Sequence, residues 1–168
     1  MSNPDPDLAQ VRLCAKGDER ALRSLVDRYQ PLVFGISRRY LGSIEDAEEV
    51  AIATFLNFWR SAGSFRGDCS VRAHLCRIAL NLCRDRPKSK PLPLPCPEPK
   101  ENSVQIELIL AALTHLPAED REALVFYYLD ELSYDEICQT LGISYDALKT
   151  RLVRARKRLR TLLEIHHE

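Results

Sequence analysis

The residues best suited to a chemical task are a run of basic side chains near the C-terminal end of this 168-residue sequence. Residues 149–160 contain no acid and seven bases: Lys149, Arg151, Arg154, Arg156, Lys157, Arg158 and Arg160. Residues 104–148 contain nine acids and a single base, Arg121, so the formal net charge of zero hides a sharp local asymmetry. A cationic patch of this kind is typical of proteins that bind the phosphate backbone of a nucleic acid.

Two other interpretations of the basic run stay open. A charge run is usually the solvated face of a helix, and a basic amphipathic helix can also bind a membrane surface or a partner protein. The nucleic-acid interpretation is favoured because signals for a capped pair of helices precede the run at the appropriate spacing.

Catalysis and metal chemistry have little support. The four histidines, His74, His115, His166 and His167, accompany neither a nucleophile nor a metal-ligand motif, and the sequence has no glycine-rich phosphate loop. We therefore expect no enzymatic activity, no cofactor and no metal site.

The cysteines raise a third possibility, a thiol or metal sensor. Cys69, Cys76 and Cys83 recur every seven residues, with His74 between them. Seven residues are two helical turns, too far for two residues of one straight helix to hold one tetrahedral ion, so small core or flank residues are the favoured interpretation. The six cysteines are expected to be free thiols.

The elements around the basic run predict a helix-turn-helix. Ser133-Tyr-Asp-Glu136 is a capping box that begins one helix, and Gly142 ends it. Ser144 can cap the next helix, in which apolar residues recur on one stripe at about 100° per residue. Two helices separated by Gly142-Ile143-Ser144 therefore fit a DNA-reading motif.

The second of these helices is expected to read DNA. Its first turns are predicted to point Tyr145, Asp146, Lys149, Thr150, Arg151 and Arg154 toward base edges in the major groove. The later Arg156, Lys157, Arg158 and Arg160 are predicted to meet phosphates, which position a protein without specifying sequence.

The wider chain is predicted to be all-α, with two small helical domains. Six prolines between Pro87 and Pro99 favour extended polyproline II over helix, so residues 87–103 are expected to form a linker. The domains are placed at 1–86 and 104–168. In the first, helical periodicity covers a short opening helix, a longer one with a kink or junction at Pro31, a helix over 45–62 and one opened by Ser70.

The N-terminus lacks a signal peptide pattern, so a cytoplasmic protein is expected.

The motifs resemble those of the extracytoplasmic-function (ECF) sigma factors, small bacterial transcription initiation subunits. In the second domain, Leu132-Ser-Tyr-Asp-Glu-Ile137, Leu141-Gly-Ile-Ser144 and the stretch from Arg151 to Arg160 match promoter-binding region four. In the first domain, Asp46-Ala-Glu-Glu-Val50, Phe65-Arg-Gly67 and Arg77-Ile-Ala79 resemble region two. The resemblance covers nearly the whole chain.

This resemblance implies roles that spacing alone does not assign. Region two would bind the clamp helices of core RNA polymerase through the helix that contains Asp46, Glu48, Glu49, Ile52, Ala53 and Leu56. It would also capture an unpaired base of the minus-10 element, with Phe65, Arg66, Arg72, Arg77 and Asn81 as candidates, because stacking and cationic side chains hold single-stranded bases. Region four would read the minus-35 duplex and rest on the polymerase flap through its first helices. The family also implies an anti-sigma factor as a partner.

The sequence departs from the family where most members have Gln-Glu, since this chain has Ile52-Ala53. Both positions are predicted to lie off the buried stripe, and with Leu56 they make the outward flank unusually apolar. The main hypothesis is a sigma factor that directs polymerase to promoters. The alternative is a sigma-like DNA-binding regulator or adaptor without productive polymerase binding.

Overall fold

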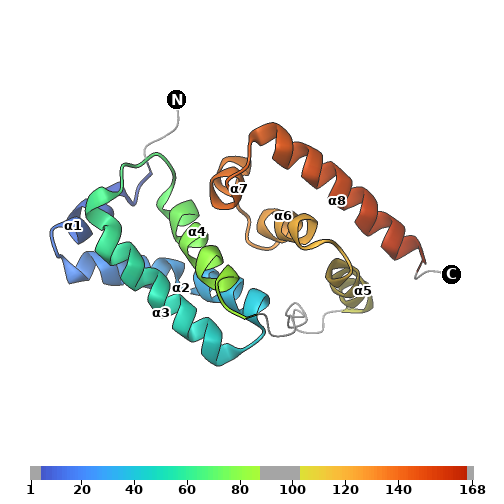
Figure 1. Cartoon of the computed structure of the whole chain (residues 1–168), viewed down its shortest axis with the longest axis horizontal. Coiled ribbons are helices and arrows are strands. Elements are labelled where there is room, and N and C mark those ends of the chain that lie inside the picture. Colours follow the sequence, from blue (N-terminus) through green and yellow to red (C-terminus); the bar gives the residue numbers. More distant parts are fainter. Residues whose placement is uncertain (1–4, 88–102, 166–168) are drawn as a thin grey trace. The chain divides into compact units, whose positions relative to one another are not determined.

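The computed structural model describes residues 5–87 and 103–165, with side chains for 5–87 and 108–165. Throughout these ranges the regular structure is helical and contains no strand, which confirms the predicted all-α class (Figure 1). The chain divides into two compact units, Met1–Leu92 and Pro93–Glu168. Beyond Pro87, the predicted linker lies outside the described residues up to residue 102.

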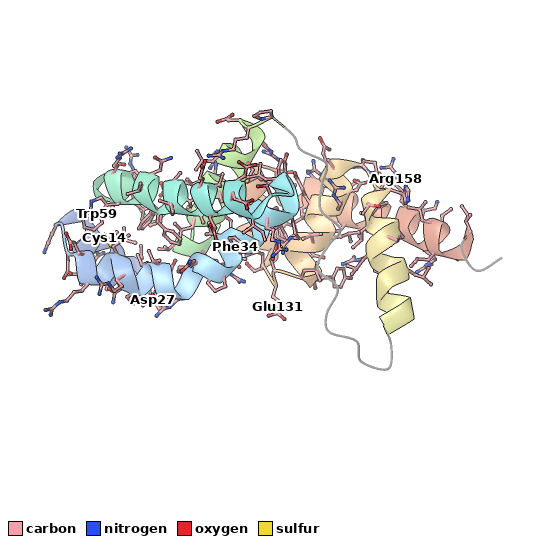
Figure 2. All side chains as sticks on the ribbon, turned by 90° about the horizontal axis from the view of Figure 1, so that it is seen from below. Cys14, Asp27, Phe34, Trp59, Glu131 and Arg158 are labelled. Carbon is pink, nitrogen blue, oxygen red and sulfur yellow. The ribbon has the colours of Figure 1, made fainter. Side chains whose placement is uncertain are left out.

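Residues 5–87 of the first unit form four α-helices and one short 3-10 turn. They are α1 (Leu8–Ala15), α2 (Glu19–Leu41), α3 (Ile44–Ser61), η1 (Ala62–Ser64) and α4 (Val71–Arg84). The helices α2, α3 and α4 pack against one another, and α1 packs against α2. Figure 2 shows the side chains on these helices, with Cys14 on α1 and Trp59 on α3.

The core of this unit is formed by the apolar stripes that the periodicity predicts. Leu25, Val33, Phe58 and Leu75 are fully shielded from solvent and come from three different helices. Burying such side chains is the main favourable term for a domain of this size.

Local signals fix the helix ends. Asp18, Ser43 and Ser70 cap α2, α3 and α4, each accepting a hydrogen bond from a backbone amide of the first turn. Of the kink or junction predicted at Pro31, a junction between two helices does not occur, because α2 continues through this residue from Glu19 to Leu41. Packing of the long apolar face of α2 against α3 and α4 outweighs the one backbone hydrogen bond that a proline removes.

Residues 103–165 of the second unit form four helices: α5 (Ser103–Thr114), α6 (Ala118–Tyr128), α7 (Tyr134–Leu141) and α8 (Tyr145–Ile165). The long helix α8 packs against each of the other three. Its Leu148, Leu152 and Ala155 are buried, together with Ile137 from α7 and Leu124 from α6. The stripe on α8 therefore anchors the helix pair to the rest of the unit.

Within the described residues, no helix of either unit is long and apolar enough to cross a membrane.

Candidate nucleic-acid interface

The turn between α7 and α8 has the helix caps and the glycine that the sequence predicts. The hydroxyl of Ser133 accepts a bond from the backbone N–H of Glu136 (3.2 Å), and the carboxylate of Glu136 accepts one from the backbone N–H of Ser133 (2.9 Å). Gly142 ends α7 in the left-handed region at φ 68°, and its amide bonds to the carbonyl of Cys138. Ser144 then caps α8 by accepting from the N–H of Ala147 (3.2 Å). The capping box, the glycine stop and the second cap are confirmed.

One face of α8 points away from the core. Lys149, Thr150 and Lys157 are exposed on it, and Tyr145 at the start of the helix is 52% exposed. These four side chains lie as predicted for residues that meet DNA.

A second group of cations on α8 is turned toward acids of α6. Arg154 donates two hydrogen bonds, from Nε (3.2 Å) and Nη2 (2.7 Å), to Oδ1 of Asp120, and Arg158 donates to Oδ2. Arg151 forms a looser ion pair with Glu119 (3.3 Å). Residues 151, 154 and 158 share one flank of the helix, because successive residues are rotated by about 100°. Arg154 and Arg158, predicted to meet base edges and phosphates, are exposed at the surface but are already paired with Asp120.

Asp120 itself is buried, with none of its surface exposed. Burial alone would raise the pKa of this carboxyl, but the hydrogen bonds and positive charges of Arg154 and Arg158 hold the pKa below its ordinary value. Asp120 is consequently a carboxylate at neutral pH. In the sequence, Asp120 is one of the nine acids of residues 104–148, and its role carries only a weak signal. That signal is its place in the first turn of α6, where an acid suits the helix dipole.

A third arrangement holds Arg156 against aromatic rings. Its guanidinium lies 5.7 Å from the ring centroids of both Tyr127 and Tyr128, and its Nε donates to the hydroxyl of Tyr128 (3.0 Å). Tyr127 in turn contacts Tyr134, edge to face, at 5.3 Å. Cation–π contacts of this kind fix the position of an arginine, so the structure gives Arg156 a packing role inside the unit.

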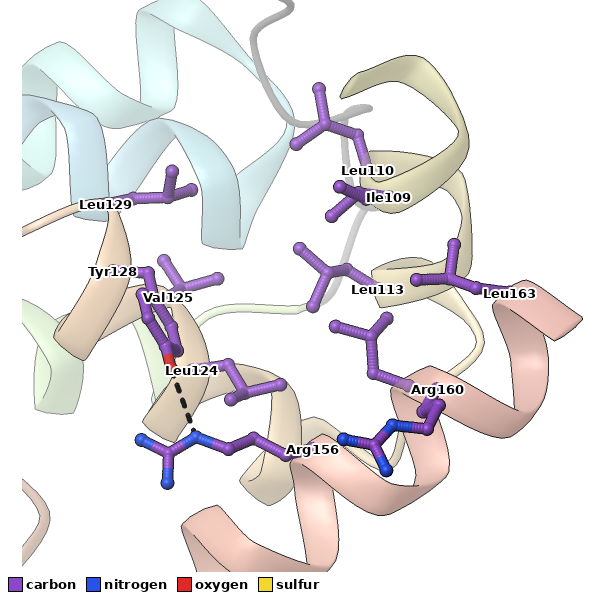
Figure 3. A pocket seen from close by; sticks show the side chains of 11 residues that line it. Ile109, Leu110, Leu113, Leu124, Val125, Tyr128, Leu129, Arg156, Arg160 and Leu163 are labelled. Atoms are coloured by element: carbon purple, nitrogen blue, oxygen red, sulfur yellow. Dashed lines mark hydrogen bonds between the residues drawn. The ribbon is translucent and has the colours of Figure 1, made fainter. Parts of the chain in front are cut away.

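An apolar groove lies beside this tyrosine pair, between α5, α6 and α8 (Figure 3). Ile109 and Leu113 line it from α5, Leu124 from α6 and Leu163 from α8, and the Arg156–Tyr128 bond borders it. Tyr128 and Leu129 at its edge are 57% and 49% exposed. Exposed apolar surface of this kind is typical of a protein docking site.

In the first unit, the minus-10 candidates lie on α4 and on the loop before it. Arg66, Arg77 and Asn81 are exposed, and Arg77 and Asn81 are one turn apart on α4. Arg72 is half-buried. Phe65 is also half-buried and packs against the core, with its ring 5.0 Å from that of His74.

The polymerase-binding candidates divide between two environments on α3. Ile52 is 62% exposed and Leu56 46% exposed, one turn apart, and the exposed Glu48 precedes them on the same flank. Ala53 is half-buried. Asp46 and Glu49 instead form ion pairs with Arg86 (3.3 and 3.0 Å). The structure thus gathers Glu48, Ile52 and Leu56 into one surface, and the apolar flank predicted there is present.

Cys69, Cys76 and Cys83, which recur every seven residues, differ in their exposure to solvent. Cys76 and Cys83 are buried, and burial raises the pKa of the Cys83 thiol to about 11. No group of three potential ligands capable of holding a metal ion occurs anywhere in the described part of the chain. Cys14, Cys69, Cys83 and Cys138 are free thiols.

Comparison with known proteins assigns the two units. The family model for sigma-70 region 2 matches residues 25–90, and that for sigma-70 region 4 matches residues 106–159. The ECF RNA polymerase sigma factor SigW of Bacillus subtilis is 30% identical over 177 residues, spanning 92% of this chain and 95% of that protein. The ECF sigma factor SigM of Mycobacterium tuberculosis is 34% identical over 155 residues, spanning 88% and 79% respectively.

Solved structures agree with this assignment. The structure of CnrH in complex with the cytosolic domain of CnrY superposes with a TM-score of 0.76 at 28% identity, covering 96% of this chain and 99% of that one. The sigma factor RpoE of Bartonella quintana, solved with the anti-sigma factor NepR, has the same fold at 20% identity and a TM-score of 0.66, covering 85% and 96%. The capped helix pair, the basic α8 and these matches identify the chain as a member of the ECF sigma factors, within the sigma-70 family.

Proposed function

We propose that this protein associates with core RNA polymerase in the cytoplasm and directs it to a set of promoters, without catalysis of its own. The observation that carries the proposal is the helix pair α7–α8, whose caps and glycine turn present an outward basic face, in a chain that also contains a region 2 unit. Residues 1–86 act as region 2, 87–103 as the linker and 104–168 as region 4.

The duplex-reading role belongs to α8. Tyr145, Lys149 and Thr150 are exposed at its N-terminal end, where a recognition helix meets base edges. Lys157 follows on the outward face and suits phosphate contact. Arg151, Arg154 and Arg156 have partners within the unit, so each must exchange an internal contact before it can bind the minus-35 duplex.

The polymerase would be held by two surfaces. In the first unit, Glu48, Ile52 and Leu56 offer an apolar ridge beside an acid, which suits the clamp helices. Ala53 borders this ridge, and Asp46 and Glu49 flank it in ion pairs with Arg86. In the second unit, the apolar groove between α5, α6 and α8 suits an apolar segment of the flap.

Capture of an unpaired minus-10 base would use the loop before α4 and the face of α4. Arg66, Arg77 and Asn81 are exposed and supply cationic and amide groups. Phe65 and Arg72 are half-buried. Their side chains can support the loop from inside the unit as well as contact a base directly.

A protein inhibitor is part of the proposal. RpoE of Bartonella quintana was solved in complex with the anti-sigma factor NepR. We extend this partnership to the present chain, in which the exposed apolar residues of α3 and of the groove would be covered in the inactive state.

One observation favours a second candidate function. Among the described residues of the first unit, Ile52 is the most exposed large apolar residue, and it replaces a polar residue that the family usually carries. A sigma-like regulator that binds DNA and a partner other than polymerase would also have such a surface.

Run-off transcription from a library of genomic promoters, with purified core polymerase and the full chain, separates the two functions. New, specific transcripts that require the protein are expected. Duplex binding without any new transcript, and without co-elution with core polymerase in size-exclusion chromatography, would instead support the regulator.

A further inference from the structure

Asp120 connects α6 to two arginines of the DNA-binding helix. Oδ1 accepts both bonds from Arg154, and Oδ2 accepts from Arg158, so both carboxylate oxygens are occupied. Asp120 is 0% exposed, whereas the side chains of Arg154 and Arg158 are each 47% exposed. The acid is inside the fold and its two partners are at the surface.

Breaking the hydrogen bonds to Arg154 and Arg158 would cost free energy at the Asp120 carboxylate. A buried carboxylate without its partners has lost its hydration and gained nothing in return. The neighbouring pair differs on the side of the acid, because Glu119 is 69% exposed at 3.3 Å from Arg151, whose own side chain is 17% exposed. Water can solvate the Glu119 carboxylate when Arg151 leaves it, so this acid loses little by being unpaired. Arg151 can therefore exchange Glu119 for a phosphate at small cost, while Arg154 and Arg158 cannot leave Asp120 as easily.

We propose that Asp120 competes with DNA phosphate for Arg154 and Arg158, and thereby lowers the affinity of the second unit for duplex DNA. The proposal rests on the DNA-binding role of α8 proposed above. It gives Asp120 the part of a positioning residue: it touches no DNA, and it determines how many of the cations on α8 are available to the phosphate backbone.

The salt dependence of DNA binding measures this number. Each phosphate that a protein neutralises releases counterions, so log K falls against log salt with a slope of about −0.9 per contact. If Asp120 withholds two arginines, Asp120→Asn should steepen the slope by about 0.9 to 1.8. The resulting gain in affinity over wild type should then shrink by about 3- to 12-fold between 50 and 200 mM salt.

The experiment uses the full chain and a duplex of mixed sequence, with binding followed by fluorescence anisotropy across a salt series. Glu164→Gln is the matched control, because Glu164 is an exposed acid on α8, the helix of Arg154 and Arg158, and its replacement makes the same change in charge as Asp120→Asn. The expected result is tighter binding and a steeper slope for Asp120→Asn than for Glu164→Gln. The triple variant D120N/R154Q/R158Q should return to the wild-type slope.

Thermal unfolding shows whether Asp120→Asn folds. If it does not, a second variant still tests the proposal. Arg158→Gln leaves Asp120 paired with Arg154 and removes a cation that the proposal withholds from DNA. Its slope should equal that of wild type, and a slope reduced by about 0.9 would overturn the proposal.

The remaining outcomes separate this inference from the proposed function. Equal affinity and slope for Asp120→Asn and Glu164→Gln, with wild type binding the duplex and supporting run-off transcription, would overturn this inference alone. Failure of wild type and Asp120→Asn alike to bind the duplex at low salt would overturn it together with the DNA-binding role of α8.

Discussion

Ser133 and Glu136 each bond the other's backbone amide, with the hydroxyl of Ser133 accepting at 3.2 Å and the carboxylate of Glu136 accepting at 2.9 Å. This reciprocal pair satisfies two amides that would otherwise lack partners at the start of α7. It fixes the first helix of the helix-turn-helix and therefore the place from which the turn delivers α8.

Replacing Ser133 with Ala should lower the free energy of unfolding of the second unit by about 1 kcal/mol, because one capped amide loses its acceptor. Chemical denaturation of the full chain, followed by circular dichroism, measures this loss. Glu136→Gln is the control, since glutamine also completes a capping box and should cost less. A larger loss for Glu136→Gln than for Ser133→Ala would contradict the assigned roles.

Asp120 should make the stability of the second unit depend on pH. Its folded-state pKa lies below the ordinary value, so its stabilising effect is complete above the unfolded-state pKa of about 3.9 and is lost as pH falls through the folded-state pKa. At pH 7, Asp120→Asn should lower the free energy of unfolding by about 1 to 3 kcal/mol.

Thermal unfolding of wild type and Asp120→Asn from pH 7 down to strongly acid solution tests this dependence. The difference in Tm between the two proteins should be constant near neutral pH and should shrink only below about pH 4. A difference that shrinks between pH 7 and pH 5 would mean that another group titrates.

Lys149→Ala should weaken promoter binding, because Lys149 is exposed on the outward face of α8 near its N-terminal end. If the side chain meets a phosphate, the slope of log K against log salt should become shallower by about 0.9. Lys16→Ala makes the same change in charge on an exposed residue of the first unit and should leave the slope unchanged. Unchanged promoter affinity for Lys149→Ala would remove this residue from the interface.

Ile52→Glu should impair assembly with core polymerase, because it places a charge in the centre of the exposed apolar ridge on α3. Burying an unpaired carboxylate in a protein interface costs enough for at least a tenfold loss of affinity, about 1.4 kcal/mol. Co-elution with core polymerase at varied protein concentration provides the measurement.

Leu13→Glu is the control for that substitution, since Leu13 is an exposed apolar residue on α1 of the same unit. It should leave assembly intact. Normal assembly of the Ile52→Glu variant would assign the ridge to another partner.

The sequence by itself determined the features of the α7–α8 pair that depend on neighbours along the chain. The capping box at Ser133, the left-handed glycine at position 142 and the cap at Ser144 involve groups within a few residues of one another. Their geometry follows from residue type alone. The apolar stripes of α3 and α8 were equally predictable, because a period of 3.6 residues assigns each side chain to a face.

Only the tertiary structure decided which cations of α8 are available for DNA. Arg154 and Asp120 are 34 positions apart, and Arg156 and Tyr128 are 28 apart. Their contacts depend on how α6 packs against α8. The outcome at Pro31 was also tertiary, since packing of α2 carried the helix through a residue that local rules treat as a break. Local propensity acts over one helical turn, whereas partners across a helix pair are chosen by the packing of the whole unit.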